Sequence, residues 1–181
     1  MNFYVKHTIL IDKTSIFSYN FNWYILFMDF IMPLITKIGN IGAVWISLGV
    51  ILLCTKKHRR LGIMLLSGLL LGFIFGNLLL KNIIVRPRPC WIDSSFPLLI
   101  KNPDDFSFPS GHTLSSFISS FVIFGKNRRF GTWAFVLAAL IAFSRLYLFV
   151  HFPTDILGAI LLAFAVWKVL CFAEKRISCK H

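Results

Sequence analysis

The amino-acid sequence predicts an all-α, polytopic membrane protein, folded as a bundle of five or six transmembrane helices. Three observations lead to this fold class. Hydrophobic residues make up 57% of the 181 residues, and the mean hydropathy is +0.75, far above that of an ordinary soluble domain. Several apolar runs approach the length that a bilayer requires of a helix. Short basic or Pro/Gly-rich stretches separate these runs, as expected for turns between membrane helices.

Residues 1–40 are predicted to be a lead-in to the bundle. Residues 1–19 lack the continuous apolar core and the small-residue cleavage site of a signal peptide. Residues 21–36 are apolar, but this run is short and is interrupted by Asp29 and Pro33. We therefore expect one of two structures here. A sixth spanning helix would place the N-terminus in the cytoplasm, whereas a helix lying in the membrane interface would leave it outside.

Residues 41–172 are predicted to form the helix bundle itself. The expected spanning helices cover residues 41–54, 61–80, 111–124, 131–150 and 154–172. Small residues that permit close helix packing recur in the second of these, at Gly62, Ser67, Gly68, Gly72 and Gly76. One long connection, residues 81–110, is polar and rich in proline. A loop of this length in a small chain usually has a function.

The formal net charge of +12 would also suit a protein that binds nucleic acid. The positions of the charges argue against such a partner, because most lie in three clusters between apolar runs. These clusters are Lys56, Lys57, Arg59 and Arg60, then Lys126, Arg128 and Arg129, and finally Lys175, Arg176 and Lys180 in a basic tail, residues 173–181. Basic turns are retained on the cytoplasmic side of a membrane. The opposite helix ends, near residues 81, 110–112 and 150–155, are therefore predicted to meet on the extracytoplasmic side of the plasma membrane.

A second group of cations lies on this predicted outer face. Its members are Lys81, Arg86, Arg88 and Arg145, and few carboxylates lie near them in the sequence. Ionisable groups at membrane depth are costly and are usually functional. Guanidinium and ammonium groups gathered at the mouth of a bundle match the oxygens of a phosphate. Ser110 and Gly111 open a predicted helix, where an N-cap hydroxyl and free N–H groups would favour the same anion.

Two histidines and an aspartate on the same face supply the groups that phosphoryl transfer requires. Asp155 follows His151 by four residues and can orient its imidazole if a helix begins between them. One histidine can attack phosphorus while the other, His112, protonates the leaving oxygen. Taken singly, such side chains also have ordinary roles: Ser110 can be only an N-cap, and Arg145 and Asp155 can form a structural ion pair. Their joint placement on one face favours an active site.

Three motifs in this part of the chain carry a family resemblance. The first is Lys81 followed after six residues by Arg88 and Pro89, the second is Pro109-Ser110-Gly111-His112, and the third is Ser144-Arg145 followed by His151 and Asp155, with five and three residues between them. In order and spacing they resemble the three-part signature of the type 2 phosphatidic acid phosphatase and vanadium haloperoxidase superfamily. The resemblance extends over residues 41–172.

This resemblance implies a role for each matching side chain. His151 would attack phosphorus and form a phosphohistidine, Asp155 would orient it, and His112 would protonate the leaving group and then activate water. The implied phosphate ligands are Lys81, Arg88 and Arg145, assisted by Ser110 and Gly111. Such family members need no metal or other cofactor. The four cysteines, 54, 90, 171 and 179, show no metal-ligand spacing. Disulfides are not expected, because Cys54, Cys171 and Cys179 fall on the basic, reducing side.

The resulting expectation is a metal-independent membrane phosphatase that acts on an amphiphilic phosphate or diphosphate. A minimal chain of this type favours undecaprenyl diphosphate as substrate and undecaprenyl phosphate as product, with phosphatidylglycerophosphate and phosphatidate as alternatives. A haloperoxidase that holds vanadate is disfavoured, because such peroxidases are typically soluble. A non-catalytic phospholipid binder or transporter is an alternative of another class, but it would not need the paired histidines. The oligomeric state and the role of Arg86 stay open.

Overall fold

The computed structural model describes residues 16–178, with side chains placed for residues 23–176, and these residues form helices and connecting loops without any strand. The elements are α2 (Ile16–Ile38), the short 3-10 helix η1 (Asn40–Gly42), α3 (Ala43–Cys54), α4 (Arg59–Gly72), the π-helical segment η2 (Phe73–Leu80), α5 (Lys81–Ile84), α6 (Pro89–Ile92), α7 (Gly111–Lys126), α8 (Arg128–Tyr147) and α9 (Pro153–Ser178). The all-α prediction is therefore confirmed.

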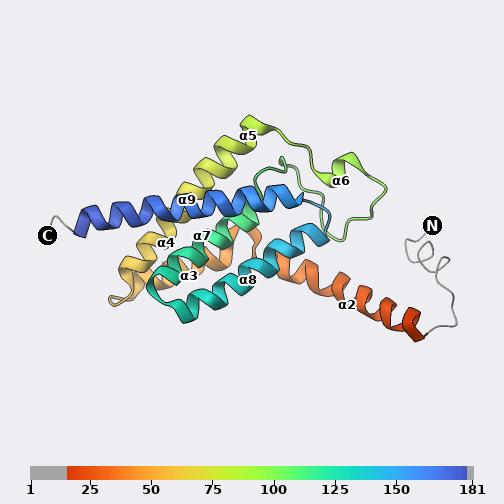
Figure 1. Cartoon of the computed structure of the whole chain (residues 1–181), viewed down its shortest axis with the longest axis horizontal. Helices are drawn as coiled ribbons and strands as arrows, with labels where there is room; N and C mark the ends of the chain where they lie inside the picture. The colour runs from red at the N-terminus through yellow and green to blue at the C-terminus, as the bar shows by residue number, and fades with distance from the viewer. Residues whose placement is uncertain (1–15, 179–181) are drawn as a thin grey trace.

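Four stretches of the described chain are long and apolar enough to span a membrane: Trp23–Cys54, Arg59–Ile92, Arg128–Tyr147 and Pro153–Arg176. The shorter α7 also runs through the bundle, packed between α4, α8 and α9 (Figure 1). The outer surface of the bundle is apolar, with large side chains such as Ile51, Leu70, Trp133, Leu161 and Val169 exposed. A surface of this kind belongs in lipid, so the chain is a multi-pass membrane protein.

The α2 helix does not reverse direction before α3. Both run in the same direction, toward the α3–α4 turn, with η1 as the bend between them (Figure 1). Of the two structures expected for residues 21–36, a sixth crossing antiparallel to α3 is therefore not the one that forms. Instead α2 packs against α8, where the Tyr147 hydroxyl donates to Asp29 at 2.7 Å.

The α3–α4 turn, the α7–α8 turn and the end of α9, which carry the described residues of the three basic clusters, lie at one end of the bundle, opposite the long loop (Figure 1). Lys126 at the end of α7 and Glu174 near the end of α9 form an ion pair of 2.6 Å, which ties two of these ends together. The predicted tail of residues 173–181 is helical as far as Ser178, because α9 continues past the last apolar residues. Cys179 and Lys180 lie outside the described residues.

Several helix boundaries differ from those predicted. The predicted helix of residues 61–80 begins at Arg59 and continues through η2 into α5. The predicted helix of residues 131–150 ends at Tyr147, because the next residues fold into a tight turn in which Phe149 has a φ of 57°. Leu148 and Val150 of this turn are fully buried. His151 therefore lies in a connection between α8 and α9, not at a helix end.

Close packing of the helices relies on glycine at two backbone contacts. At Gly62 of α4, an added Cβ would lie 2.7 Å from the backbone nitrogen of Leu53 in α3. At Gly131 of α8, an added Cβ would lie 2.3 Å from the Cα of Phe124 in α7. Backbone atoms cannot rotate away from such a clash, so both helix pairs need the missing side chain. The packing role predicted for Gly62 is thereby confirmed.

Replacing Gly131 with alanine is expected to force α7 and α8 apart and to lower the free energy of unfolding by about 1–3 kcal/mol, the usual cost of overpacking. Gly125→Ala is the matched control, because its added Cβ would meet the nearest atom, Nε1 of Trp167, at an ordinary 3.4 Å. Thermal unfolding of the two variants in detergent checks this expectation. Equal melting temperatures would show that the α7–α8 contact is not tight.

Candidate active site

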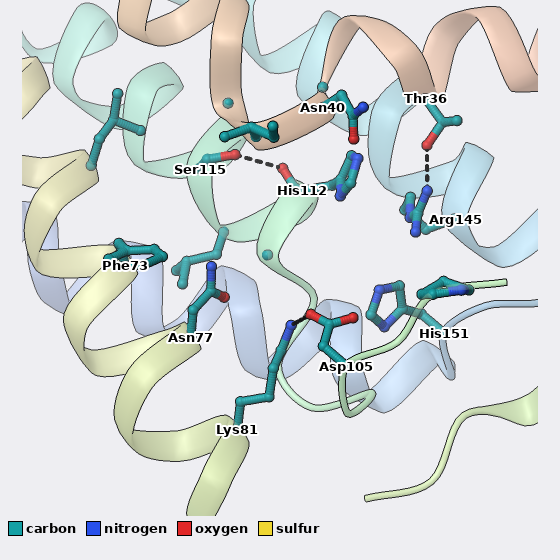
Figure 2. Close-up of a pocket in the computed structure, with 18 of the residues that line it drawn as sticks. Thr36, Asn40, Phe73, Asn77, Lys81, Asp105, His112, Ser115, Arg145 and His151 are labelled. Carbon is teal, nitrogen blue, oxygen red and sulfur yellow. Dashed lines mark hydrogen bonds and ion pairs between the residues drawn. The ribbon is translucent and has the colours of Figure 1, made fainter. Parts of the chain in front are cut away.

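A cavity of about 1030 Å³ opens at the end of the bundle opposite the basic turns. Its wall combines residues that are far apart in the sequence: Lys81, Arg88, Asp105, Gly111, His112, Arg145 and His151. Figure 2 shows the labelled side chains of this group entering one space from α5, the long loop, α7, α8 and the α8–α9 connection. The predicted convergence of three segments is therefore present in the structure. Ser110 and Asp155 lie directly behind this wall and are fully buried.

Asp155 holds His151 from one side. Its Oδ2 lies 3.5 Å from Nδ1 of His151, and it accepts hydrogen bonds from the Ser107 hydroxyl at 2.5 Å and from the Phe152 backbone N–H at 2.8 Å. The short chain from His151 to Asp155 enters α9 at Pro153, so the expected helix begins between the two residues. The carboxylate is thus immobilised by several donors and can orient the imidazole.

Arg88 determines which nitrogen of His151 carries the proton. Nη1 of Arg88 lies 3.1 Å from Nε2 of His151 and also donates to the Val150 carbonyl at 2.8 Å. Arginine can only donate, so Nε2 of His151 must carry a lone pair and the proton must sit on Nδ1, facing Asp155. This tautomer follows from the hydrogen-bonding partners. It leaves Nε2 unprotonated on the cavity side, with a lone pair that accepts from Arg88 in this structure.

The surroundings of His151 keep this imidazole uncharged. Burial lowers its pKa to about 4, and the positive charges of Arg88 and Arg145 act in the same direction, while the hydrogen bond and the charge of Asp155 oppose the shift. The neutral form is therefore the dominant form at physiological pH.

Lys81 and Arg88 share one carboxylate that the sequence analysis did not single out. Asp105, on the long loop, forms ion pairs with both side chains, and its backbone carbonyl accepts from Nε of Arg88 at 2.6 Å. Although burial alone would raise the pKa of Asp105, the hydrogen bonds and charges of the two cations lower it to about 2. Figure 2 places Asp105 between Lys81 and His151. This half-exposed carboxylate thus occupies the space that the cations would offer to a phosphate.

Arg145 reaches the cavity from α8 and is anchored by α2. Its Nη1 donates to the Thr36 hydroxyl at 2.6 Å, and both side chains are buried. Its Nε has no hydrogen-bond partner. A buried guanidinium with an unused donor lacks part of its coordination, which an anion in the cavity would complete.

The start of α7 differs in one detail from the prediction. Ser110 occupies the N-cap position, but its side chain caps no backbone N–H and instead accepts a hydrogen bond from the Thr113 hydroxyl at 3.0 Å. The backbone N–H groups of the first turn are therefore not covered by this hydroxyl. Gly111 and His112 follow it and both line the cavity. The ring of His112 enters the cavity from the opposite wall to Lys81 (Figure 2).

Arg86 does not enter the cavity wall. Its Nη1 pairs with Oδ1 of Asp155 at 2.8 Å and donates to the Thr154 hydroxyl at 2.6 Å, while its guanidinium lies 4.1 Å from the centre of the Phe152 ring. It therefore clamps the long loop to the start of α9, behind the carboxylate that orients His151.

Within residues 23–176, no group of three or more His, Cys, Asp and Glu side chains is arranged to hold a metal ion. Cys54, Cys90 and Cys171 are free thiols in this part of the chain.

Comparison with protein families agrees with this geometry. Residues 59–177 match the model of the PAP2 superfamily, a stretch that includes all three motifs and every wall residue from Lys81 to His151. The chain belongs to the PAP2 superfamily.

The chain is also similar to two undecaprenyl-diphosphatases. The chain is 29% identical over 136 residues to an undecaprenyl-diphosphatase of Sulfolobus acidocaldarius, covering 73% of this chain and 64% of that protein. It is 29% identical over 143 residues to the undecaprenyl-diphosphatase BcrC of Bacillus subtilis, covering 77% and 71%. The match thus spans just under two thirds of the archaeal relative's length.

A solved structure shares the fold as well. The transmembrane PAP2-type phosphatidylglycerolphosphate phosphatase of Bacillus subtilis superposes with a TM-score of 0.68 at 26% identity, covering 83% of this chain and 78% of that one. The PAP2 fold of this membrane protein is therefore shown by sequence and by structure.

Asp105→Asn in this PAP2 protein is expected to strengthen the binding of a phosphate-like anion, because Lys81 and Arg88 would lose their internal counter-ion. Vanadate should inhibit turnover at a concentration lower by about 3- to 10-fold, a modest factor because Asp105 is half-exposed and solvent screens its charge. Asp104→Asn is the matched control, since Asp104 pairs only with exposed Lys101 at 3.8 Å. Weaker inhibition in Asp105→Asn would mean that the carboxylate organises the cations instead of competing for them.

Proposed function

We propose that this protein is a lipid phosphatase that converts undecaprenyl diphosphate to undecaprenyl phosphate through a phosphohistidine at His151, without a metal ion. The observation that carries this proposal is the neutral Nε2 of His151, which faces a cavity walled by Lys81, Arg88 and Arg145. A nucleophile among cations is what displacement at a phosphate requires. The diphosphatase activity of the two relatives supports the choice of substrate.

In the first step Nε2 of His151 attacks the terminal phosphorus. A nitrogen–phosphorus bond forms while the bond from phosphorus to the bridging oxygen breaks, and His112 delivers a proton to that leaving oxygen. The proton on Nδ1 of His151 stays in place, and Asp155 stabilises the positive charge that the ring acquires. Held in this way, the ring needs no reorientation as it gains charge.

In the second step water attacks the phosphohistidine. His112, now neutral, accepts a proton from the water as the new oxygen–phosphorus bond forms. The nitrogen–phosphorus bond breaks, which returns the lone pair to Nε2 and releases inorganic phosphate. Lys81, Arg88 and Arg145 stabilise the negative charge on the phosphoryl oxygens in both steps. Asp105 is then available to replace the departing phosphate as their counter-ion.

The shape of the cavity supports a lipid substrate. Its polar end holds the cations and histidines, whereas the wall between α3 and α4 is formed by Ile46, Leu66, Leu69, Leu70 and Phe73. Leu70 and Phe73 are also exposed on the apolar outer surface of the bundle. A phosphate in the polar end can therefore carry a chain that continues directly into the lipid.

Charge placement supports reaction at the outer leaflet of the plasma membrane. The basic turns lie at the end of the bundle that is opposite the cavity, and such turns are retained in the cytoplasm. The phosphate group would then be removed on the extracytoplasmic side.

A second candidate function is hydrolysis of phosphatidylglycerophosphate, favoured by the similarity to the solved phosphatase of that specificity. A non-catalytic phospholipid binder or transporter is disfavoured, because binding alone requires neither the oriented His151 nor the second histidine.

Purified protein in detergent is expected to release phosphate from undecaprenyl diphosphate in the presence of EDTA. His151→Ala should lower turnover by more than about 10³-fold, because the nucleophile is lost, while substrate binding is retained. His58→Ala is the matched control, since His58 lies exposed in a basic turn at the far end of the bundle. Comparing phosphatidylglycerophosphate and phosphatidate on the same preparation identifies the preferred substrate. Full activity in His151→Ala, or a loss of wild-type activity with EDTA, would refute the mechanism.

The pH dependence of kcat/KM should reflect the depressed pKa of His151. The nucleophile is active when neutral, so the acid limb of the profile should fall through the pKa of His151 in the folded protein, which is about 4, whereas the proton that His112 donates governs the basic limb. Substantial activity should therefore persist at pH 5.5, where an unperturbed histidine of pKa 6.5 would be mostly protonated. Initial rates at subsaturating substrate between about pH 3.5 and 8 measure this limb. An acid limb centred near 6.5 would contradict the proposed role of burial and of Arg88.

A further inference from the structure

One polar side chain in the cavity wall has no part in the mechanism above. Asn77 lies in η2, four residues before Lys81, and it lines the same cavity. Its Oδ1 is buried and has no hydrogen-bond partner. Buried polar atoms in proteins are nearly always paired, so an unpaired amide oxygen beside a cavity indicates that a ligand supplies the partner.

The backbone around Asn77 holds this amide in place. Segment η2 is π-helical, a conformation that is rare and is frequently found at functional sites. Phe73, Asn77 and Lys81 follow one another at four-residue intervals, and all three line the cavity. Across from η2, the first turn of α7 packs so closely that a Cβ on Gly111 would lie 3.1 Å from Oδ1 of Asn77. The amide is thus wedged against the Ser110–His112 turn.

The direction of the reaction places the leaving group on this side of the cavity. In a displacement at phosphorus, the attacking and leaving atoms lie roughly in line. Figure 2 shows His151 on one side of the site and Asn77 with Phe73 on the other, while Lys81 and Asp105 lie between them. A phosphate attacked by His151 therefore points its leaving oxygen toward Asn77.

Beyond Asn77 the wall becomes apolar, with Phe73, Leu70 and Leu66 next along α4 and η2. Asn77 is consequently the last polar side chain of this helix before the region suited to a lipid chain. In a bound substrate, the atoms that join the scissile oxygen to the lipid would therefore lie next to Asn77. In a lipid diphosphate those atoms are the second phosphate.

We propose that Asn77 binds the second phosphate of a lipid diphosphate, the group that leaves with the lipid, and so favours diphosphates over phosphate monoesters. This inference rests on the proposed function. Nδ2 donates to a non-bridging oxygen of the second phosphate, which a simple alcohol leaving group lacks. After His112 has protonated the bridging oxygen, that oxygen becomes a P–OH group and donates to Oδ1. Both halves of the amide then have partners, and a neutral amide does so without trapping the anionic product.

The test compares an anion that fills only the first phosphate position with the product that carries only the second. Vanadate probes the first position, and undecaprenyl phosphate, as a competitive product inhibitor, probes the second. Asn77→Leu removes the amide at similar size, and Asn77→Asp places a negative charge there. Asn82→Leu is the matched control, because Asn82 bonds to the Leu78 carbonyl at 2.8 Å and does not line the cavity.

In Asn77→Leu the inhibition constant of undecaprenyl phosphate should rise about tenfold, the effect of losing one or two hydrogen bonds to a charged group. In Asn77→Asp it should rise more, because the two negative charges repel. The inhibition constant of vanadate should change by less than about threefold in both, and Asn82→Leu should change neither value. The kcat/KM for undecaprenyl diphosphate should fall in parallel with the rise in the inhibition constant of undecaprenyl phosphate.

Parallel changes for vanadate and undecaprenyl phosphate, or no change for undecaprenyl phosphate, would overturn the role of Asn77. The same holds if the kcat/KM for phosphatidylglycerophosphate falls most, since this would indicate recognition of a hydroxyl group. These results differ from a failure of the proposed function itself. In that case the wild-type protein would not hydrolyse undecaprenyl diphosphate at all, whatever residue stood at position 77.

Discussion

The structure depends on holding several cations out of water at one end of an apolar bundle. Lys81, Arg88 and Arg145 are all buried, and desolvating a charge is expensive unless partners replace the lost water. Asp105 serves two of them and Thr36 serves the third. Nε of Arg145 is unpaired beside the cavity, and Nη1 of Arg88 contacts the unprotonated nitrogen of His151 there. A bound phosphate would complete the coordination of these cations, and under the proposed mechanism it would draw Arg88 away from the nitrogen that attacks.

The irregular parts of the backbone follow from the same requirement. Regular helices satisfy their own backbone groups, whereas the residues that hold Lys81, Arg88 and Asp155 come from loops and turns. The helices therefore end at the site: α8 stops before the turn that carries His151, and the long loop folds back so that Asp105 and Ser107 reach the cations and Asp155. At the opposite end, simple basic turns suffice. Tight glycine contacts hold neighbouring helices close together near this end.

Much of this arrangement was predictable from the sequence, for identifiable reasons. Apolar runs reveal membrane helices because lipid tolerates little else, and the basic turns indicate which helix ends lie together at one end of the bundle. The two histidines, Asp155 and the three cations were found because ionisable groups are rare in such a chain and stand out. Asp105, Ser107 and Thr36 were missed, since a loop carboxylate and two hydroxyls are common residues whose partners are distant in the sequence. The acidic pair at positions 104–105, facing a cation-rich surface, was the one available signal.

The sequence by itself determined the membrane bundle, the side of the molecule that carries the site, and the residues of its three motifs. These depend on hydropathy, charge and spacing, which are local properties of the chain. Only the tertiary structure decided that Arg86 clamps Asp155, that Asp105 neutralises Lys81 and Arg88, and that Nε2 of His151 is the unprotonated nitrogen. These are pairings between segments that meet only after the helices have packed. Their partners are selected by geometry within a few ångströms, and no periodicity in the sequence records that geometry.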